Sequence, residues 1–317
     1  MIVFAMPQNT SSPHFNTNFD PKTGHLVQLG PDIARVCAPN RGAYTFTGTN
    51  SYLVGNDEII IIDPGPNDAA HFDALIRAIK DRPVKGILLT HTHKDHSGMA
   101  TRLQNHIKAP LWFGGRHKLS RPRRLFEINL LHGACDWKLT PDQHLRNGDI
   151  VEVENTRLEV IATPGHCANH LCFGVQGSPY LFSGDHVMGW NSTLVATPDG
   201  SMADYFNSLD HMAELKWRHY FPGHGAPIED LGPKNNGLSF ARALRTHRAI
   251  RNQQILDQVA NGATSVQKIV SGIYPEVSTK IKIAAAMTVV AHIEYLEDKG
   301  LLVVKRNLLG HMALSPA

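Results

Sequence analysis

The chain carries 19 histidines among 317 residues, and residue types that bind metals crowd into one short stretch of it. This stretch, THTHKDHSG at residues 90–98, places His91, His93, Asp95 and His96 within six positions, directly after an apolar run. Two histidines two residues apart point to the same side of an extended chain and can bind one cation. Asp95 and His96 then point elsewhere, and they are residue types that a second cation nearby requires.

Three further residues of ligand type occur in a shared local setting, in which an apolar run is followed by glycine and then by the ligand. They are His166 in VIATPGH, Asp185 in YLFSGD and His224 in YFPGH. Glycine permits the tight turn that aims such a side chain back at the edge of a sheet. Strand ends of this kind can share one rim, so we expect the seven side chains to converge.

The elements that must position these residues follow a β-rich pattern up to about residue 230. Short apolar runs between Gly, Pro, Asp and Asn residues predict strands at 51–54, 59–62, 86–89, 111–113, 158–162, 171–175, 180–182 and 219–221. Apolar residues spaced three to four apart predict helices at 69–80, 97–106 and 205–215. Strands interleaved with helices indicate a layered α/β body.

The pattern changes near Gly232, where the turn-rich segment LGPKNNG precedes a long helical pattern over residues 238–260. This helix carries four regularly spaced arginines, Arg242, Arg245, Arg248 and Arg251. Beyond it we expect two helices, at 266–271 and 278–299, and an extended run at 301–306, an order that fits a winged-helix-like module. Eleven Lys and Arg residues stand against five Asp and Glu residues from residue 231 onward, so the tail is basic.

Composition excludes several classes of protein. A hydrophobic content of 42% and a charged content of 19% are typical of globular chains, and 317 residues are long for a single core. No apolar run approaches the roughly 20 residues of a membrane span, and MIVFAM is too short for a signal peptide. The four cysteines form no C-x-x-C pair, so we expect a soluble cytoplasmic protein without membrane partners. The sequence does not define the oligomeric state.

The ordered motifs resemble those of the metallo-β-lactamase superfamily over about residues 45–230: IIDPG at 61–65, HTHKDH at 91–96, TPGH at 163–166, SGD at 183–185 and PGHG at 222–225. The resemblance implies an α/β fold, the four-layer αβ/βα sandwich, with a dinuclear site at one edge of its two sheets. It also implies ligand roles. His91, His93 and His166 would bind the first metal, Asp95, His96 and His224 the second, and Asp185 would bridge them.

No ligand position is substituted, which argues against a member without metal. We expect two Zn²⁺ per chain, because imidazoles with carboxylates suit zinc, and the same ligands accommodate Mn²⁺ or Fe²⁺ as alternatives. In the superfamily the aspartate of IIDPG, here Asp63, supports the ligand loop by hydrogen bonding. His170 is a candidate to orient a ligand or to protonate a leaving group. The other histidines need no functional explanation.

When two divalent cations bind the same water molecule, they lower its pKa and so provide hydroxide near neutral pH. We therefore expect a hydrolase that uses a metal-bridging hydroxide, with Asp95 as the catalytic proton acceptor. Most of the chain, from about residue 47 to 306, resembles the lactamase-beta-like 2 family, in which known activity includes cleavage of single-stranded RNA. We therefore expect residues 1–232 to form the catalytic domain, 233–262 a basic linker helix and 263–317 the winged-helix-like domain.

The substrate has three interpretations. The basic tail favours RNA, with Arg242, Arg245, Arg248 and Arg251 tracking phosphates, although those arginines could equally form a solvated helix face. A basic cluster at 116–124 could line an entrance groove or form an exposed loop. The alternative enzyme is a small-molecule thioester, ester or lactone hydrolase similar to glyoxalase II. The alternative from another class is a nucleic-acid-binding module with a vestigial metal site.

Overall fold

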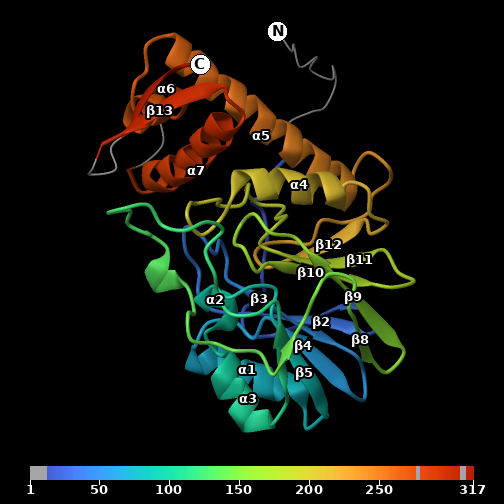
Figure 1. Cartoon of the computed structure of the whole chain (residues 1–317). Coiled ribbons are helices and arrows are strands. Elements are labelled where there is room, and N and C mark those ends of the chain that lie inside the picture. Colours follow the sequence, from blue (N-terminus) through green and yellow to red (C-terminus); the bar gives the residue numbers. More distant parts are fainter. Residues whose placement is uncertain (1–12, 276–278, 308–311) are drawn as a thin grey trace.

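Two mixed β-sheets lie face to face in the computed structural model, which describes residues 13–275, 279–307 and 312–317 (Figure 1). The first sheet runs in chain order: β1 (Leu26–Gly30), β2 (Ile33–Cys37), β3 (Asn50–Val54), β4 (Ile59–Ile62), β5 (Val84–Leu88), β6 (Leu111–Phe113) and β7 (Gln143–His144). The second has the order β12 (His219–Pro222), β11 (Tyr180–Gly184), β10 (Leu171–Val175), β9 (Thr156–Ala162) and β8 (Ile150–Val153).

Helices cover the outer face of each sheet, so that the body has four layers (Figure 1). The helices α1 (Ala69–Ile79) and α3 (Ala100–Ile107) pack on the first sheet. The helix α4 (Met202–Met212) and the first half of α5 (Gly237–Ala260) pack on the second. This arrangement confirms the α/β class and the αβ/βα layering that the sequence predicts.

Strand β4 shows how the sequence builds these layers. Its four isoleucines are all buried, and alternate side chains point to opposite faces of the sheet. Ile59 and Ile61 belong to the core under α1 and α3, whereas Ile60 and Ile62 belong to the core between the two sheets. A continuous apolar run is what a strand covered on both faces requires.

The C-terminal part follows the body and has its own apolar core. It contains α6 (Val266–Ile273), α7 (Thr279–Asp298) and an antiparallel hairpin of β13 (Leu302–Arg306) and β14 (Met312–Pro316). The helix α5 joins the two parts, because Leu244 packs with the second sheet while Ile255 packs with α6, α7 and the hairpin. Figure 1 shows α5 extending from α4 to the hairpin.

Several elements were not predicted from the sequence, chiefly β1, β2, β8 and β14. Strand β2 hides a polar residue in an apolar setting: Arg35 is 2% exposed and its Nη2 donates to the carbonyl of Pro21 at 3.1 Å. The predicted helix at 97–106 corresponds to α3, and a separate short helix that was not predicted, α2 (Lys94–Ser97), precedes it and carries Asp95 and His96. No helix in the described ranges is long and apolar enough to cross a membrane.

Candidate metal centre

The seven ligand-type residues lie at one edge of the sandwich because they follow strands that point the same way. Strands β4 and β5 are parallel, β11 and β12 are parallel, and β9 runs in the same direction as β11 because each is antiparallel to β10. His91 and His93 follow β5, and α2 then carries Asp95 and His96. His166 follows β9, Asp185 follows β11 and His224 follows β12.

Hydrogen bonds join the two sheets at this edge and so hold the strand ends in register. The side-chain amide of Asn50, on the first sheet, donates to the carbonyls of Pro222 and Gly225 at 3.0 and 2.9 Å. The hydroxyl of Tyr52 donates to the carbonyl of Pro222 at 2.6 Å. The backbone N–H of Leu171 donates to the carbonyl of Thr90 at 2.7 Å. The ligand loops are therefore tied to one another across the two sheets.

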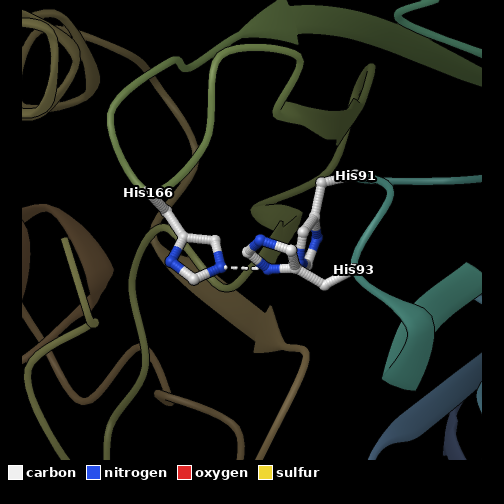
Figure 2. Close-up of side chains that lie close together, drawn as sticks. All are labelled: His91, His93 and His166. Atoms are coloured by element: carbon white, nitrogen blue, oxygen red, sulfur yellow. Dashed lines mark hydrogen bonds between the residues drawn. The ribbon is translucent and has the colours of Figure 1, made fainter. Parts of the chain in front are cut away.

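Three imidazole nitrogens converge in the first group, as Figure 2 shows. The Nδ1 atom of His93 lies 3.0 Å from Nε2 of His91 and 2.9 Å from Nε2 of His166. Ligand atoms about 2.05 Å from one tetrahedral cation lie about 3.3 Å apart, so the observed spacing is close to that of a shared cation.

A second group of four side chains adjoins the first. Nε2 of His224 lies 3.2 Å from Oδ2 of Asp95 and 3.3 Å from Oδ2 of Asp185, and Nε2 of His96 lies 3.4 Å from Oδ1 of Asp185. The two groups meet at Asp185, whose Oδ2 is 3.8 Å from Nε2 of His166. Asp185 is thus the carboxylate placed between them.

Each of the five histidines has its other ring nitrogen held by an oxygen atom. This arrangement fixes the tautomer and the direction of the ring in metal-binding histidines. The pairs are His91 Nδ1 with Thr90 Oγ1 at 3.0 Å, His93 Nε2 with Asp199 Oδ2 at 2.8 Å, His96 Nδ1 with Asp63 Oδ2 at 2.9 Å, His166 Nδ1 with the Leu194 carbonyl at 2.7 Å, and His224 Nδ1 with the Gly48 carbonyl at 3.2 Å.

Two glycines let the ligand atoms approach one another. A Cβ on Gly223 would lie 2.4 Å from Oδ1 of Asp185 and 2.6 Å from Cε1 of His96. Gly184 has φ +50°, and a Cβ there would lie 2.6 Å from Nε2 of His170. The glycines of the SGD and PGHG motifs are therefore required by close packing inside the site.

The electrostatics of the site fit cations. Within the described residues no hydrogen bond reaches Oδ1 of Asp185, although this atom is buried. Burial opposes ionisation of Asp185, yet the imidazoles of His224 and His96 hold its pKa well below its usual range. Burial and the neighbouring imidazole of His96 keep the pKa of His91 well below its usual range, so His91 offers a free lone pair. A buried anionic carboxylate together with an imidazole that stays neutral, here His91, is a donor set that fits divalent cations.

The two supporting residues suggested by the sequence occupy different places. Asp63, in the left-handed region with φ 52°, accepts from the backbone N–H of Thr90 at 2.7 Å and contacts His96. His170 is 1% exposed, and its Nε2 accepts from the backbone N–H of Asp185 at 3.2 Å. Burial keeps the pKa of His170 well below its usual range. His170 therefore supports the turn that carries Asp185 through this backbone hydrogen bond.

Sequence reasoning missed Asp199 and His117. Asp199 is fully buried, and its two oxygens contact Nε2 of His93 at 2.8 Å and Nε2 of His117 at 2.7 Å. Burial opposes ionisation of Asp199, but the hydrogen bonds from both rings hold its pKa below its usual range. Cys135 lies in the same place, and burial raises the pKa of its thiol well above the usual range, so it stays protonated. The signal in the sequence was the Pro-Asp-Gly stretch at residues 198–200, which a turn explains equally well.

The four arginines proposed for nucleic acid all make contacts within the chain. Arg242 donates to the carbonyl of Ala213 at 2.6 Å, and Arg245 pairs with Asp210 at 2.9 Å. Arg248 is 3% exposed and donates to the carbonyl of Thr193, and Arg251 lies over the ring of Tyr274 at 4.3 Å. In this structure the row packs α5 onto the body and onto the loop before α7.

Comparison with known proteins agrees with this geometry. A family model described as the metallo-beta-lactamase superfamily matches residues 44–224, more than half of the chain. A solved structure of a beta-lactamase domain protein from Burkholderia ambifaria shares the fold, with a TM-score of 0.75 over 94% of this chain and 95% of that one at 22% identity. The chain therefore belongs to the metallo-beta-lactamase superfamily, whose members are metal-dependent hydrolases.

Three relatives are similar over a longer part of the chain than the family model matches. The lactamase-like protein adaB of Aspergillus niger is 28% identical over 242 residues, which are 74% of this chain and 66% of adaB. This chain thus spans just under two thirds of adaB. An atrochrysone carboxyl ACP thioesterase of Aspergillus chevalieri is 27% identical over 80% of this chain and 77% of its own length. A beta-lactamase-like protein 2 homolog of Drosophila melanogaster is 29% identical over 89% and 93%.

Proposed function

We propose that this protein is a two-metal hydrolase that cleaves a small-molecule thioester. The single observation that carries the hydrolase assignment is the convergence of seven ligand-type side chains in two adjoining groups that share Asp185. His91, His93 and His166 would hold one cation, and Asp95, His96 and His224 the other. Bound divalent cations would lower the pKa of water and polarise the carbonyl oxygen under attack.

The residues of the chain define where the proton goes in this proposal. Asp95 has a side chain that is 29% exposed, whereas those of Asp185 and His224 are 8% and 0% exposed. Asp95 is therefore the carboxylate of the group that faces incoming water and substrate. It accepts one proton of the attacking water while the carbonyl carbon gains the oxygen. The carbon–sulfur bond then breaks, the leaving sulfur takes that proton from Asp95 to give a thiol, and the carboxylic acid loses its proton to solvent to give a carboxylate.

The relatives support a thioester substrate. The metal centre alone does not, because the same ligands could serve the hydrolysis of several kinds of bond. The Aspergillus chevalieri relative is named a thioesterase and aligns with 80% of this chain. Its alignment extends past residues 44–224, the range of the family model, and so includes sequence outside the ligand motifs.

The test is a substrate panel with metal-loaded protein: an acyl thioester, a lactone, a cephalosporin and single-stranded RNA. We expect thiol release from the thioester to be fastest, and Asp95→Asn to lower it by about 10²- to 10⁴-fold. Asp57→Asn, on an exposed turn, is the matched control. Cleavage of RNA with no thioester turnover would refute the proposal.

Cleavage of single-stranded RNA is the second candidate. The basic tail from residue 231 onward and the resemblance to the lactamase-beta-like 2 family favour it, and a beta-lactamase-like protein 2 homolog aligns with 89% of this chain. The contacts of Arg248 and Arg251 within the chain weaken the electrostatic argument for it. A binding module without catalysis would require an incomplete ligand set, and metal content near zero in the purified protein would favour that alternative.

We further propose two Zn²⁺ per chain, with Mn²⁺ or Fe²⁺ as alternatives, and elemental analysis of the purified protein tests this.

The described C-terminal elements, α6, α7 and the β13–β14 hairpin, support a winged-helix-like unit after residue 262. The four cysteines are free and buried, which supports a reducing, cytoplasmic location.

A further inference from the structure

An apolar cavity lies between the segment 127–131 and α7, near residues that contact His93. Its volume is about 270 Å³, and its walls are residues 127–131, the pair Ala196 and Thr197, and one face of α7 that includes Ile283 and Met287. Substrate pockets are typically lined by apolar groups with a few polar ones. Here Nδ2 of Asn129 is a buried donor without a hydrogen-bond partner in the described chain, so the lining keeps one polar contact for a ligand.

The segment that forms one wall, which we call the apolar loop (residues 125–131), exposes several large hydrophobic side chains close together in the sequence. Leu125, Phe126, Ile128 and Leu130 are between 64% and 76% exposed, and Ile283 on the facing helix is 52% exposed. Contiguous exposed apolar groups mark binding grooves. In Figure 1 the green segment that contains this loop lies beside α7.

Two of the cavity walls lead directly to His93. Thr197 is two residues before Asp199, which holds Nε2 of His93 at 2.8 Å. On the other side, the carbonyl of Leu131 accepts from the thiol of Cys135 at 3.1 Å, and Cys135 forms a β-bridge with His93. The cavity walls are thus linked to His93 through Asp199 on one side and through Cys135 on the other.

Ion pairs hold the apolar loop against α7 and keep the cavity walls in place. Arg121 pairs with Glu127 on the loop and with Glu294 on α7, each at 2.6 Å, and Arg124 also pairs with Glu294. These contacts neutralise Glu127, the charged residue of the lining. A cavity whose only carboxylate is already paired is suited to an uncharged, apolar group.

We propose that this cavity binds the acyl part of the substrate, and that the protein prefers medium-length apolar acyl thioesters to acetyl thioesters. This inference rests on the proposed function for the bond that is cleaved. The carbonyl carbon then lies at the ligand residues while the acyl chain extends along Thr197 toward Ile128 and Ile283. The thiol carrier, which is the polar half of a thioester, remains on the side of the exposed Asp95.

A chain-length series tests the preference. With N-acetylcysteamine thioesters from acetyl to octanoyl, kcat/KM should rise roughly fourfold for each methylene that enters the cavity. Ile128→Asp on the loop and Ile283→Asp on α7 should each remove at least about fivefold of the octanoyl advantage, because a charge then faces the acyl chain. Acetyl thioester turnover should stay unchanged. Leu125→Asp is the matched control, since Leu125 is equally exposed but does not line the cavity.

A binding measurement separates this inference from the proposed reaction. Calorimetry with the non-hydrolysable octanoyl and acetyl amides of cysteamine should give tighter binding of the octanoyl amide, and Ile128→Asp should reduce this difference at least about fivefold. If no thioester is cleaved yet this difference is found, the proposed function fails and the cavity assignment stands. Equal binding of both amides, or an equal loss in Leu125→Asp and Ile128→Asp, would overturn the cavity assignment.

Discussion

Replacing Asp199 by asparagine should weaken one metal site selectively. Asp199 is the buried carboxylate that joins His93 to His117, and it makes no contact with His96 or His224. Loss of a group that orients a metal-binding histidine typically lowers metal affinity about 10- to 100-fold, or about 1.4 to 2.7 kcal/mol. The side-chain amide of an asparagine accepts hydrogen bonds at its oxygen but only donates them at its nitrogen. It therefore cannot replace both carboxylate oxygens as acceptors for the rings of His93 and His117.

Competition with a chromophoric chelator measures this effect. We expect Asp199→Asn to weaken the first binding step by that factor while the second site, built on Asp95, His96 and His224, changes little. His117→Gln should weaken it less, because the carboxylate then still holds His93. Asp57→Asn on the exposed turn is the control. Unchanged affinity in Asp199→Asn, with folding verified by thermal unfolding, would refute the proposed role of Asp199, as would equal loss at both sites.

Three further outcomes follow from the geometry. Gly223→Ala should prevent the second metal from binding, because a Cβ would lie 2.4 Å from Oδ1 of Asp185; full metal content in this variant would contradict the packing argument. Although burial lowers the pKa of His224, Asp185 raises it to about 9, so in the metal-free protein this ring is protonated below that pH. Metal affinity measured from pH 6.5 to 9 should therefore rise with pH, because protons compete less with the metal. An affinity that does not change with pH would contradict this. Arg248→Met should lower the free energy of unfolding by about 1–3 kcal/mol, since it leaves the Thr193 carbonyl without its donor, whereas the exposed Arg242→Met should cost less in the same denaturation assay.

The positions of the seven ligand-type residues could be predicted because strand ends and glycines are visible in the sequence. Periodicity locates the strands, and each ligand residue follows one of them within a few positions. Gly184 and Gly223 mark turns where side chains would collide. Local patterns were thus sufficient for the inner part of the site.

Contacts between distant segments could not be predicted in the same way. Asp199 meets His93 across 106 positions, and Arg121 meets Glu294 across 173. Arg248 is basic and regularly spaced like a phosphate-binding residue, yet it is buried against Thr193 because α5 packs on the body. Strand β2 was missed for a related reason, since the buried Arg35 finds its acceptor in a segment outside the sheet. Tertiary partners, which spacing does not reveal, decide these cases.

The central claim is that these seven side chains form a two-metal site that hydrolyses a thioester. The most direct measurement is thiol release from an octanoyl thioester by metal-free protein as Zn²⁺ is added in known equivalents. We predict that activity starts near zero, rises with added metal and levels off at two equivalents per chain, and that His91→Ala and Asp95→Asn stay inactive throughout. Full activity without metal, or unchanged turnover in either variant, would contradict the account.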